Sequence, residues 1–411
     1  MHFLYQISIK LYQFIIWTAS FFNQKARLWI DGRRRQKLVT VDASIWFHFA
    51  SLGEFEQGRP VLEKLRSENS TLKTVVTFFS PSGYEIRKNT LLADYVYYLP
   101  LDTRKNARQF IQTINPKIAV FTKYEYWYYY FDELYQHEIP LYLISAIFRP
   151  QQIFFRGYGD FHRSMLLLVQ HFFVQDEASK KLLKSIEVNN VSVSGDTRFD
   201  RVWQNATNAE PIELINLFKN DKPVFIAGST WPPDEDLVAG LISIYPDWKF
   251  IIAPHEISKE KIKNLLQKLP AEKTICYSEI KADETVLRQK QVLVIDNIGL
   301  LSKLYQYGNI AYIGGGFGTG IHNTLEAAAF GLPVIFGPIY QKFKEAHDLI
   351  SLNAGFSIVN EASLESIVSK LIHDKKFYAD AATQAKNYTR QNTGATDLIC
   401  KHIQTAYLKK H

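Results

Sequence analysis

The sequence predicts an α/β fold with two doubly wound, Rossmann-like domains that face each other across a central cleft. Short β-rich runs alternate with helical patterns from Ser44 onward, as in parallel sheets covered by helices. This rhythm breaks once, in polar stretches around residues 205–211 and 220–223, and then restarts at Val224. The length of 411 residues exceeds the size at which one hydrophobic core keeps growing, which also favours two domains.

Composition limits the class of protein. The chain is 46% apolar and 22% charged, enough to bury real cores. Its two cysteines, Cys276 and Cys400, have neither disulfide-framework nor zinc-site spacing, which indicates a reducing compartment. The net charge of +7 suits nucleic acid, an anionic membrane or acidic substrates, and charge alone does not choose among them.

The N-terminal segment, residues 1–37, predicts association with a membrane. An apolar stretch from Phe3 to Phe22, interrupted by Lys10, is followed by a basic cluster at Lys25, Arg27, Arg33, Arg34, Arg35 and Lys37. This order is typical of a helix anchored at the cytoplasmic face of the inner membrane beside anionic lipid. We favour anchoring over spanning, because the lysine and the amide side chains oppose full insertion. An amphipathic helix packed on its own domain is the alternative.

Strands are predicted in order along both halves. The first half has them at 45–50, 74–79, 95–99, 118–122, 141–145, 172–174 and 191–193, and the second at 224–227, 250–253, 292–295, 310–313 and 334–336. The expected domains are 38–208 and 209–411, with the C-terminal helices packing back toward the first. Ligands of such sheets bind at the carboxyl ends of strands, so informative residues should follow strands directly.

The segment 310–334 is the most informative part of the second half. It predicts a strand, a glycine-rich loop that includes Gly315, a helix and another strand. Loop amides beside a helix N-terminus attract phosphate, and the glycine spacing matches neither a dinucleotide fingerprint nor a Walker loop. Asn323 and Glu326 share one helix face, where Glu326 is expected to accept hydrogen bonds from ribose hydroxyls. The alternative is a capping box formed by these two residues.

Glu54 is the candidate catalytic carboxylate of the first half. It follows a predicted strand and Gly53, a place where a general base can be presented to a sugar hydroxyl. The alternative is an acid that complements a helix dipole. Pro60 complicates a regular helix at this point.

Other charged and aromatic residues carry weaker signals. Glu125 and Arg198 also follow strands, yet the residues alone favour ordinary surface charges or ion pairs there. His48, inside an apolar strand, is interpreted as a satisfied core residue rather than a ligand. The aromatic run 124–131 is expected to be core and apolar rim, because no basic stripe interleaves it as nucleic-acid binding would require. No histidine pair has metal-site spacing.

Taken together, these motifs resemble one family, the Kdo transferases, which attach 3-deoxy-D-manno-oct-2-ulosonic acid to lipid A precursors. The resemblance runs in order over nearly the whole chain. It rests on the segments Lys25 to Arg33, Ala50-Ser-Leu-Gly-Glu54, Ser80-Pro-Ser-Gly83, Glu125-Tyr-Trp127, Gly195-Asp-Thr-Arg-Phe-Asp200, and Gly314 through His322-Asn-Thr-Leu-Glu-Ala-Ala328.

The resemblance implies an inverting GT-B glycosyltransferase of lipopolysaccharide biosynthesis that uses CMP-Kdo as donor, with no metal or other cofactor. The first domain would hold the acceptor, with Glu54 as the base and Glu125 and Arg198 supporting the transition state. CMP would contact Pro254, His255, Ile298, Gly299, Leu300, Gly315, Asn323, Thr324, Leu325 and Glu326 in the second domain.

Two positions depart from the family pattern. His255 stands where an arginine is common, and Arg198 stands where a lysine is common. Backbone contacts to cytosine would survive the first change, and the second keeps the charge but alters its geometry. Three alternatives remain: a transferase of the same architecture with a UDP-sugar donor, a non-hydrolysing sugar epimerase, and a basic scaffold at a membrane or nucleic acid.

Overall fold

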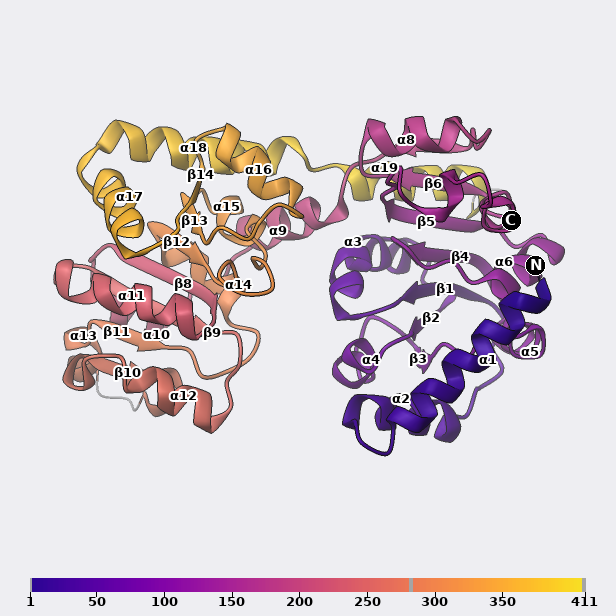
Figure 1. Ribbon diagram of the computed structural model, residues 1–411, viewed down its shortest axis with the longest axis horizontal. Helices are drawn as coiled ribbons and strands as arrows, with labels where there is room; N and C mark the ends of the chain where they lie inside the picture. Colours follow the sequence, from indigo (N-terminus) through magenta and orange to yellow (C-terminus); the bar gives the residue numbers. More distant parts are fainter. Residues whose placement is uncertain (1, 281–283, 409–411) are drawn as a thin grey trace. The chain divides into compact units, whose positions relative to one another are not determined.

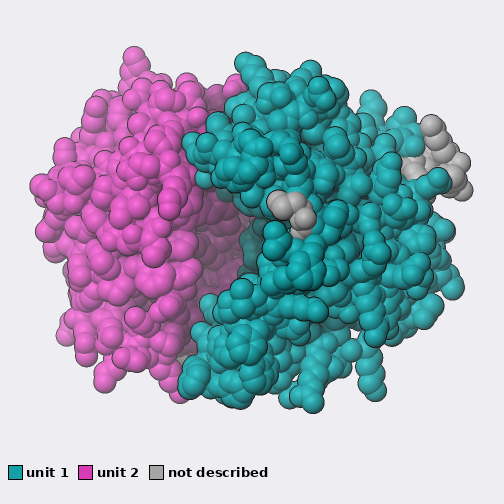
Figure 2. Space-filling view, turned by 45° about the vertical axis from the view of Figure 1, so that its right-hand side comes forward, with its two compact units in different colours: residues 1–201, 393–411 teal, residues 202–392 magenta. Residues whose placement is uncertain are grey.

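The computed structural model describes residues 2–280 and 284–408, and the chain divides into two compact units (Figures 1 and 2). Unit 1 comprises residues 1–201 and 393–411, and unit 2 comprises residues 202–392. Each unit contains one seven-stranded sheet in which every strand pair is parallel. The doubly wound α/β class predicted for both halves is therefore confirmed.

The sheet of unit 1 has the strand order β3-β2-β1-β4-β5-β6-β7. Its strands are β1 (Ser44–Phe49), β2 (Lys73–Phe78), β3 (Tyr95–Tyr98), β4 (Pro116–Thr122), β5 (Leu141–Ala146), β6 (His171–Val174) and β7 (Val191–Val193). Its helices are α1 (His2–Ala19), α2 (Gln24–Arg35), α3 (Leu52–Glu68), α4 (Pro81–Arg87), α5 (Arg104–Ile114), α6 (Tyr128–Gln136), α7 (Asp160–Leu166), α8 (Glu177–Lys184) and α19 (Ala395–Ile403). Helix α9 (Thr197–Thr207) spans the boundary between the units.

Unit 2 has the strand order β10-β11-β9-β8-β12-β13-β14. Its strands are β8 (Val224–Thr230), β9 (Lys249–Pro254), β10 (Thr274–Cys276), β11 (Val292–Val294), β12 (Ile310–Ile313), β13 (Val334–Phe336) and β14 (Gly355–Ser357). Its helices are α10 (Glu213–Lys219), α11 (Pro232–Ile244), α12 (Lys259–Leu266), α13 (Glu284–Gln289), α14 (Leu301–Leu304), α15 (Leu325–Ala329), α16 (Lys344–Ser351), α17 (Glu361–His373) and α18 (Lys375–Gln391).

Short non-α helices occur in both units. Unit 1 has η1 (Ile153–Phe155) and η5 (Gln404–Leu408), and unit 2 has η2 (Ala271–Lys273), η3 (Tyr277–Glu279) and η4 (Tyr305–Tyr307).

Both faces of the first sheet are covered, which explains why its central strands are apolar throughout rather than alternating. All six residues of β1 are buried. One face packs on α5 to α8 through residues such as Phe110 and Leu166. The other face packs on α3 and on α19, whose Ile399 and Ile403 belong to the same hydrophobic cluster as Phe55.

The return of the chain to unit 1 is fixed by one acidic residue. Asp200 accepts hydrogen bonds from the backbone N–H of Gly394 at 2.6 Å, from the N–H of Thr396 at 2.7 Å and from the Thr396 hydroxyl at 2.7 Å. Gly394 adopts a φ of 110°, which glycine tolerates and most residues do not. These bonds satisfy free amides at the start of α19 and hold that helix on the sheet.

One side of the N-terminal helix α1 packs on the rest of unit 1. The Tyr5 hydroxyl donates to the buried carboxylate of Asp102 at 2.5 Å, and Tyr12 stacks on Phe79 with ring centroids 6.0 Å apart. Within the described parts of the chain, no helix is long and apolar enough to cross a membrane. The packing of α1 on the rest of unit 1 agrees with the alternative of an amphipathic helix packed on its own domain.

Pro60 does not end the helix that follows β1. Helix α3 runs on through this buried residue to Glu68. A Cβ at Gly58 would lie 2.5 Å from the Phe49 ring and 2.8 Å from the Thr122 hydroxyl, so the glycine allows α3 to approach β1 and β4 closely.

Candidate functional site

Glu54, Glu125 and the glycine-rich loop lie at the switch points of the two sheets, where the strand order reverses direction. In unit 1 this point lies between β1 and β4, and in unit 2 between β8 and β12. Helices leave such neighbouring strands toward opposite faces, so a crevice opens at the carboxyl ends and takes the ligand in many doubly wound proteins. Glu54 follows β1 and Glu125 follows β4, whereas the glycine-rich loop follows β12.

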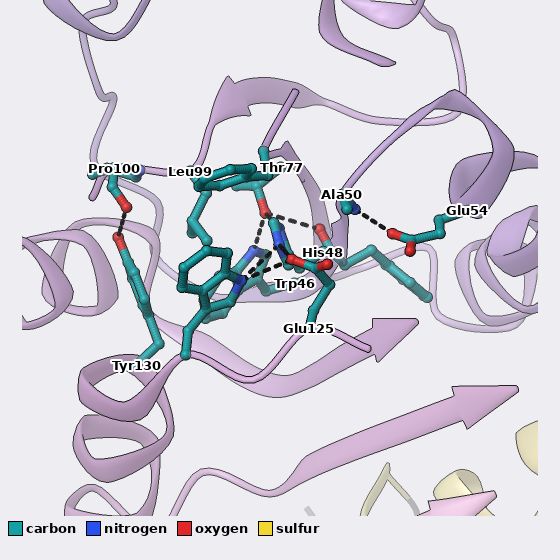
Figure 3. Close-up of polar contacts among 12 residues, drawn as sticks. Trp46, His48, Ala50, Glu54, Thr77, Leu99, Pro100, Glu125 and Tyr130 are labelled. Carbon is teal, nitrogen blue, oxygen red and sulfur yellow. Dashed lines mark hydrogen bonds and ion pairs between the residues drawn. The ribbon is translucent and has the colours of Figure 1, made fainter. Parts of the chain in front are cut away.

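Glu54 lies in the first turn of α3, half-buried beside the end of β1. Its Oε2 atom accepts a hydrogen bond from the backbone N–H of Ala50 at 2.5 Å (Figure 3). Burial, and secondarily the negative charge of Glu125, raise the pKa of Glu54 to about 7. Lys123 and the backbone bonds lower this pKa, but by less than burial raises it. The carboxylate is therefore poised to exchange a proton near neutral pH.

Glu125 belongs to a buried hydrogen-bond network centred on His48. The carboxylate oxygen Oε2 lies 3.2 Å from His48 Nε2 and accepts a hydrogen bond from Trp127 Nε1 at 2.9 Å. The other imidazole nitrogen of His48 lies 2.8 Å from the Thr77 hydroxyl (Figure 3). His48 is thus a satisfied core residue, as expected, but it also contacts the predicted functional residue Glu125.

Arg198 is held by its own motif. Its Nε atom donates to Asp196 Oδ2 at 2.8 Å, and its backbone N–H donates to Asp196 Oδ1 at 2.9 Å. Asp196 is buried and also accepts a hydrogen bond from Gln57 of α3 at 2.6 Å. The half-exposed Tyr124 is within electrostatic range of both Glu54 and Arg198, so the structure brings the three predicted residues of unit 1 into one neighbourhood.

Backbone strain marks the same strand ends. Lys123, Ser145 and Ser229 have φ values of 62°, 49° and 53°, and each lies at or just after the carboxyl end of a central strand. Non-glycine residues rarely adopt this left-handed region, which costs on the order of 1–3 kcal/mol and is concentrated at functional sites.

In unit 2 the loop after β12 is organised around a buried carboxylate that sequence analysis missed. Asp234 of α11 accepts hydrogen bonds from the Gly315 N–H at 2.9 Å, the Trp231 N–H at 2.9 Å and the Tyr312 hydroxyl at 2.7 Å. The Gly315 amide is therefore already bonded to an internal anion, and a phosphate would have to be held by other groups of the loop.

Gly315 itself is required by the loop geometry. Its φ is 92°, and a Cβ there would lie 2.4 Å from the carbonyl oxygen of Gly320. The order strand, glycine loop, helix, strand predicted for this segment is confirmed by β12, α15 and β13. However, α15 has only five residues, so its dipole is weaker than that of a long helix.

Asn323 and Glu326 contact each other at the start of α15. Asn323 Nδ2 donates to Glu326 Oε1 at 3.1 Å, and Asn323 Oδ1 accepts from the backbone N–H of Leu325 at 3.1 Å. These contacts differ from the capping box of the alternative interpretation, because Asn323 caps the Leu325 amide and Glu326 bonds the Asn323 side chain rather than its backbone. The fully buried Thr324 has a hydroxyl with no hydrogen-bond partner among the described residues.

Three aromatic rings stack beside this loop. His255, which directly follows Pro254 of β9, stacks on Trp231 with centroids 4.8 Å apart and on His322 with centroids 4.3 Å apart. Trp231 Nε1 donates to His322 Nε2 at 3.1 Å, and burial, followed by His255, lowers the pKa of His322. A small cavity of about 170 Å³ adjoins the stack, lined by Trp231, Pro232, Pro233, Asp234, Phe317, Gly318 and Thr319.

The remaining predicted positions form a separate turn between β11 and α14. Ile298 is 89% exposed, Gly299 has a φ of 91°, and Leu300 precedes the first residue of α14. Within the described residues, Ile298, Gly299 and Leu300 form no hydrogen bond with Asn323 or Glu326. Within residues 2–280 and 284–408, no group of three or more His, Cys, Asp or Glu side chains could hold a metal ion.

Comparison with known proteins finds a family model and relatives that are similar to this chain. The model of the family described as 3-deoxy-D-manno-octulosonic-acid transferase (kdotransferase) matches residues 22–201. The 3-deoxy-D-manno-octulosonic acid transferase of Haemophilus influenzae is 26% identical over 380 residues, which cover 89% of this chain and 88% of the relative. The enzyme of the same name from Aquifex aeolicus is 26% identical, covering 83% of this chain and 90% of the relative.

A solved structure of low sequence identity shows that the fold is shared, and nothing more. UDP-GlcNAc 2-epimerase from Neisseria meningitidis, bound to UDP-GlcNAc, aligns with a TM-score of 0.62 at 17% identity and covers 88% of this chain and 100% of that one. The family match spans the β1, β4 and β7 ends that carry Glu54, Glu125 and Arg198. The relatives extend the likeness across both units, so the chain is similar over most of its length to 3-deoxy-D-manno-octulosonic acid transferases.

Proposed function

We propose that this protein is an inverting glycosyltransferase that moves Kdo from CMP-Kdo to a glucosamine hydroxyl of a lipid A precursor, in lipopolysaccharide biosynthesis. The observation that carries the proposal is Glu54. This half-buried carboxylate, with its pKa raised to about 7, lies at a switch point of a chain whose relatives are Kdo transferases. A general base works best when its pKa is near the working pH.

The reaction is a single displacement. Glu54 accepts the proton of the acceptor hydroxyl while that oxygen forms a bond to the anomeric carbon of Kdo. The bond from this carbon to the phosphate oxygen breaks on the opposite side, and its electron pair leaves with CMP. Inversion follows because the new bond forms on the face away from the leaving group.

Charge stabilisation falls to residues of both units. Arg198, fixed by Asp196, supplies a guanidinium that can pair with an anionic group in two parallel hydrogen bonds. The loop after β12 and the turn that contains Gly299 are the proposed contacts of CMP. Because the leaving group carries one phosphate, the proposed mechanism requires no metal.

The N-terminal helices are proposed to rest on an anionic membrane surface. One side of α1 packs on unit 1, whereas Phe3, Leu4, Leu11, Phe14, Ile15 and Trp17 are between 47% and 73% exposed. A cavity of about 910 Å³ between α1, α2 and α5 is lined by Lys10, Arg33, Arg34 and Lys37. Exposed apolar side chains beside cations suit a helix lying in the interface, where a lipid-linked acceptor would also reside.

Donor identity is the direct test. In a thermal-shift assay we expect CMP-Kdo and CMP to raise the midpoint of unfolding, and UDP and UDP-GlcNAc to leave it unchanged. Protection by UDP-GlcNAc together with release of an epimerised sugar would replace this proposal with the epimerase alternative, whose fold the chain shares.

A further inference from the structure

Glu125 is held from the interior of unit 1 by a fully buried histidine. His48 lies in β1, next to Thr77 of β2 and Phe121 of β4 in the register of the sheet. Both of its ring nitrogens are used, with Nδ1 2.8 Å from Thr77 Oγ1 and Nε2 3.2 Å from Glu125 Oε2 (Figure 3). A buried imidazole with two defined partners has a fixed orientation.

The hydrogen-bond partners assign the proton to Nε2. Trp46 Nε1 donates to Thr77 Oγ1 at 2.9 Å, so the threonine oxygen acts as an acceptor there and its own hydrogen is available to a third group. His48 Nδ1 at 2.8 Å is a nearer acceptor than the Phe47 carbonyl at 3.3 Å. The Thr77 hydroxyl therefore donates to Nδ1, and Nε2 carries the N–H. Trp127 Nε1 also lies 3.3 Å from His48 Nε2, but its shorter contact, at 2.9 Å, is with Glu125 Oε2. A bare Nε2 would instead set a lone pair against a carboxylate oxygen.

Trp127 provides a second donor to the same oxygen. Its Nε1 lies 2.9 Å from Glu125 Oε2, and its ring stacks on Phe79 with centroids 4.7 Å apart and an angle of 29°. In the described chain, no donor is bonded to the other carboxylate oxygen, Oε1. Two fixed donors on one oxygen restrict the carboxylate and leave its second oxygen available for a substrate group.

We propose that His48 is a positioning residue of the transfer reaction: together with Trp127 it fixes the Glu125 carboxylate, and so sets the electrostatic field at the base Glu54. This inference rests on the proposed function for its kinetic consequence but not for its geometry. His48 itself is too deeply buried to touch substrate, so its effect passes through Glu125.

The charged and titratable groups around Glu54 and Glu125 come from α3, from the loop after β4 and from α1. Glu54 is in electrostatic contact with Glu125, Lys123 and Tyr124, and Glu125 is also in contact with Tyr12 of α1 and with Tyr126. The negative charge of Glu125 is the second cause, after burial, of the raised Glu54 pKa. Loosening Glu125 should therefore lower that pKa.

Two variants separate positioning from a merely structural role. His48→Phe keeps a planar ring but removes both nitrogens, whereas His48→Gln keeps an amide that can donate to Glu125. With His48→Phe we expect the acid limb of the kcat profile to move to lower pH, and kcat at pH 7 to fall about tenfold with KM nearly unchanged. His48→Gln should restore the wild-type limb. Equal losses in both variants at every pH, with an unmoved limb, would show that His48 only supports the fold.

A second readout does not depend on enzyme activity. The Glu54 carboxyl can be titrated by NMR in the full chain labelled with ¹³C at the glutamate carboxyl carbon, and assigned with Glu54→Gln. Trp127→Phe keeps the aromatic ring but removes the donor, and should lower the Glu54 titration midpoint in the same direction as His48→Phe. The control Trp248→Phe makes the same chemical change in unit 2 and should leave it unmoved.

The two readouts also distinguish failures. An unchanged Glu54 midpoint in Trp127→Phe and His48→Phe overturns the positioning role, even if the protein is an active transferase. A lowered midpoint in a protein that transfers no Kdo keeps the positioning role and rejects the proposed function. If His48→Phe does not fold, Trp127→Phe alone decides the question.

Discussion

The Glu54 carboxylate accepts a hydrogen bond from the backbone N–H of Ala50, four residues earlier, at 2.5 Å. This contact ties the first turn of α3 to the end of β1, so the position of the proposed base is set by the sheet rather than by a free loop. A catalytic group on such a rigid junction keeps its geometry between turnovers, which is what general-base catalysis requires.

Replacing Glu54 tests its role directly. Glu54→Gln keeps the side-chain shape and an acceptor for the Ala50 amide, but cannot take up a proton. We expect turnover to fall at least about a hundredfold with little change in thermal stability. Glu68→Gln, at the far end of the same helix, is the matched control and should retain wild-type turnover. Near-normal transfer by Glu54→Gln would remove this residue from the mechanism.

The rate should depend on pH through Glu54. The base acts in its ionised form and its pKa is raised to about 7, so kcat should rise with pH through neutrality and level off above it. Glu125→Gln removes a neighbouring negative charge, which lowers the pKa of Glu54 and moves this limb to more acidic pH. A pH–rate profile of both proteins measures the shift, and a limb that moves to higher pH would contradict the electrostatic account.

Arg198 depends on the carboxylate that orients it. Asp196→Asn removes the charge that holds the guanidinium at 2.8 Å, so Arg198 should become more mobile and turnover should fall about tenfold. Arg198→Lys keeps the charge but loses the two-pronged geometry, and should fall by a similar factor. Steady-state kinetics of the two single variants and the double variant measure their coupling. Strictly additive losses would show that the two residues act independently.

Gly315 is predicted to be intolerant of any side chain. In Gly315→Ala the new Cβ would meet the Gly320 carbonyl and the residue would be held at a φ of 92°, at a cost of about 1–3 kcal/mol. The loop should rearrange, and protection by CMP in the thermal-shift assay should be lost. Gly318→Ala is the control in the same loop, because its nearest neighbour would be 3.8 Å away. Equal protection of both variants would exclude this loop from donor binding.

The N-terminal helix should stabilise unit 1 through Tyr5. Burial raises the pKa of Asp102 to about 6, because the interior favours the protonated carboxyl. The stability that Asp102 contributes in this form is fully present below its unfolded pKa and is lost as pH rises through 6. Tyr5→Phe removes a donor to this carboxylate and should lower the free energy of unfolding by about 1–3 kcal/mol at pH 8, and by less at pH 4. Urea unfolding at both pH values measures it, with exposed Tyr158→Phe as control. A larger loss at pH 4 would contradict this assignment.

Most strands could be predicted from the sequence, because the buried strands of a doubly wound sheet are short apolar runs bounded by turn residues. Twelve of the observed strands match predicted runs within a few residues, whereas the edge strands β10 and β14 were missed. Each has three residues, and β14 (Gly355–Ser357) is partly exposed with a glycine and a serine, so it lacks the apolar signal of a central strand. Pro60, which complicates a regular helix in the sequence, lies inside α3, because tertiary packing outweighs its local cost.

The candidate site was only partly predictable, because motifs identify residues but not their partners. Glu54 and the loop around Gly315 could be found from their place after strands. The pairing of His48 with Glu125 could not be predicted, because the two residues are 77 positions apart in the sequence. They are brought together only because β1 and β4 are neighbours in the sheet. Asp234 was also missed, as an acid in a first helical turn commonly complements the dipole and gives no sign of reaching a distant glycine loop.

The most direct measurement is a transfer assay read by mass spectrometry. The full-length protein is mixed with CMP-Kdo and a tetraacylated lipid A precursor, in parallel with Glu54→Gln and with UDP-GlcNAc in place of CMP-Kdo. The account predicts lipid product carrying one or more Kdo residues and stoichiometric CMP only in the wild-type reaction with CMP-Kdo. Unmodified lipid in that reaction, or equal product from Glu54→Gln, would contradict it.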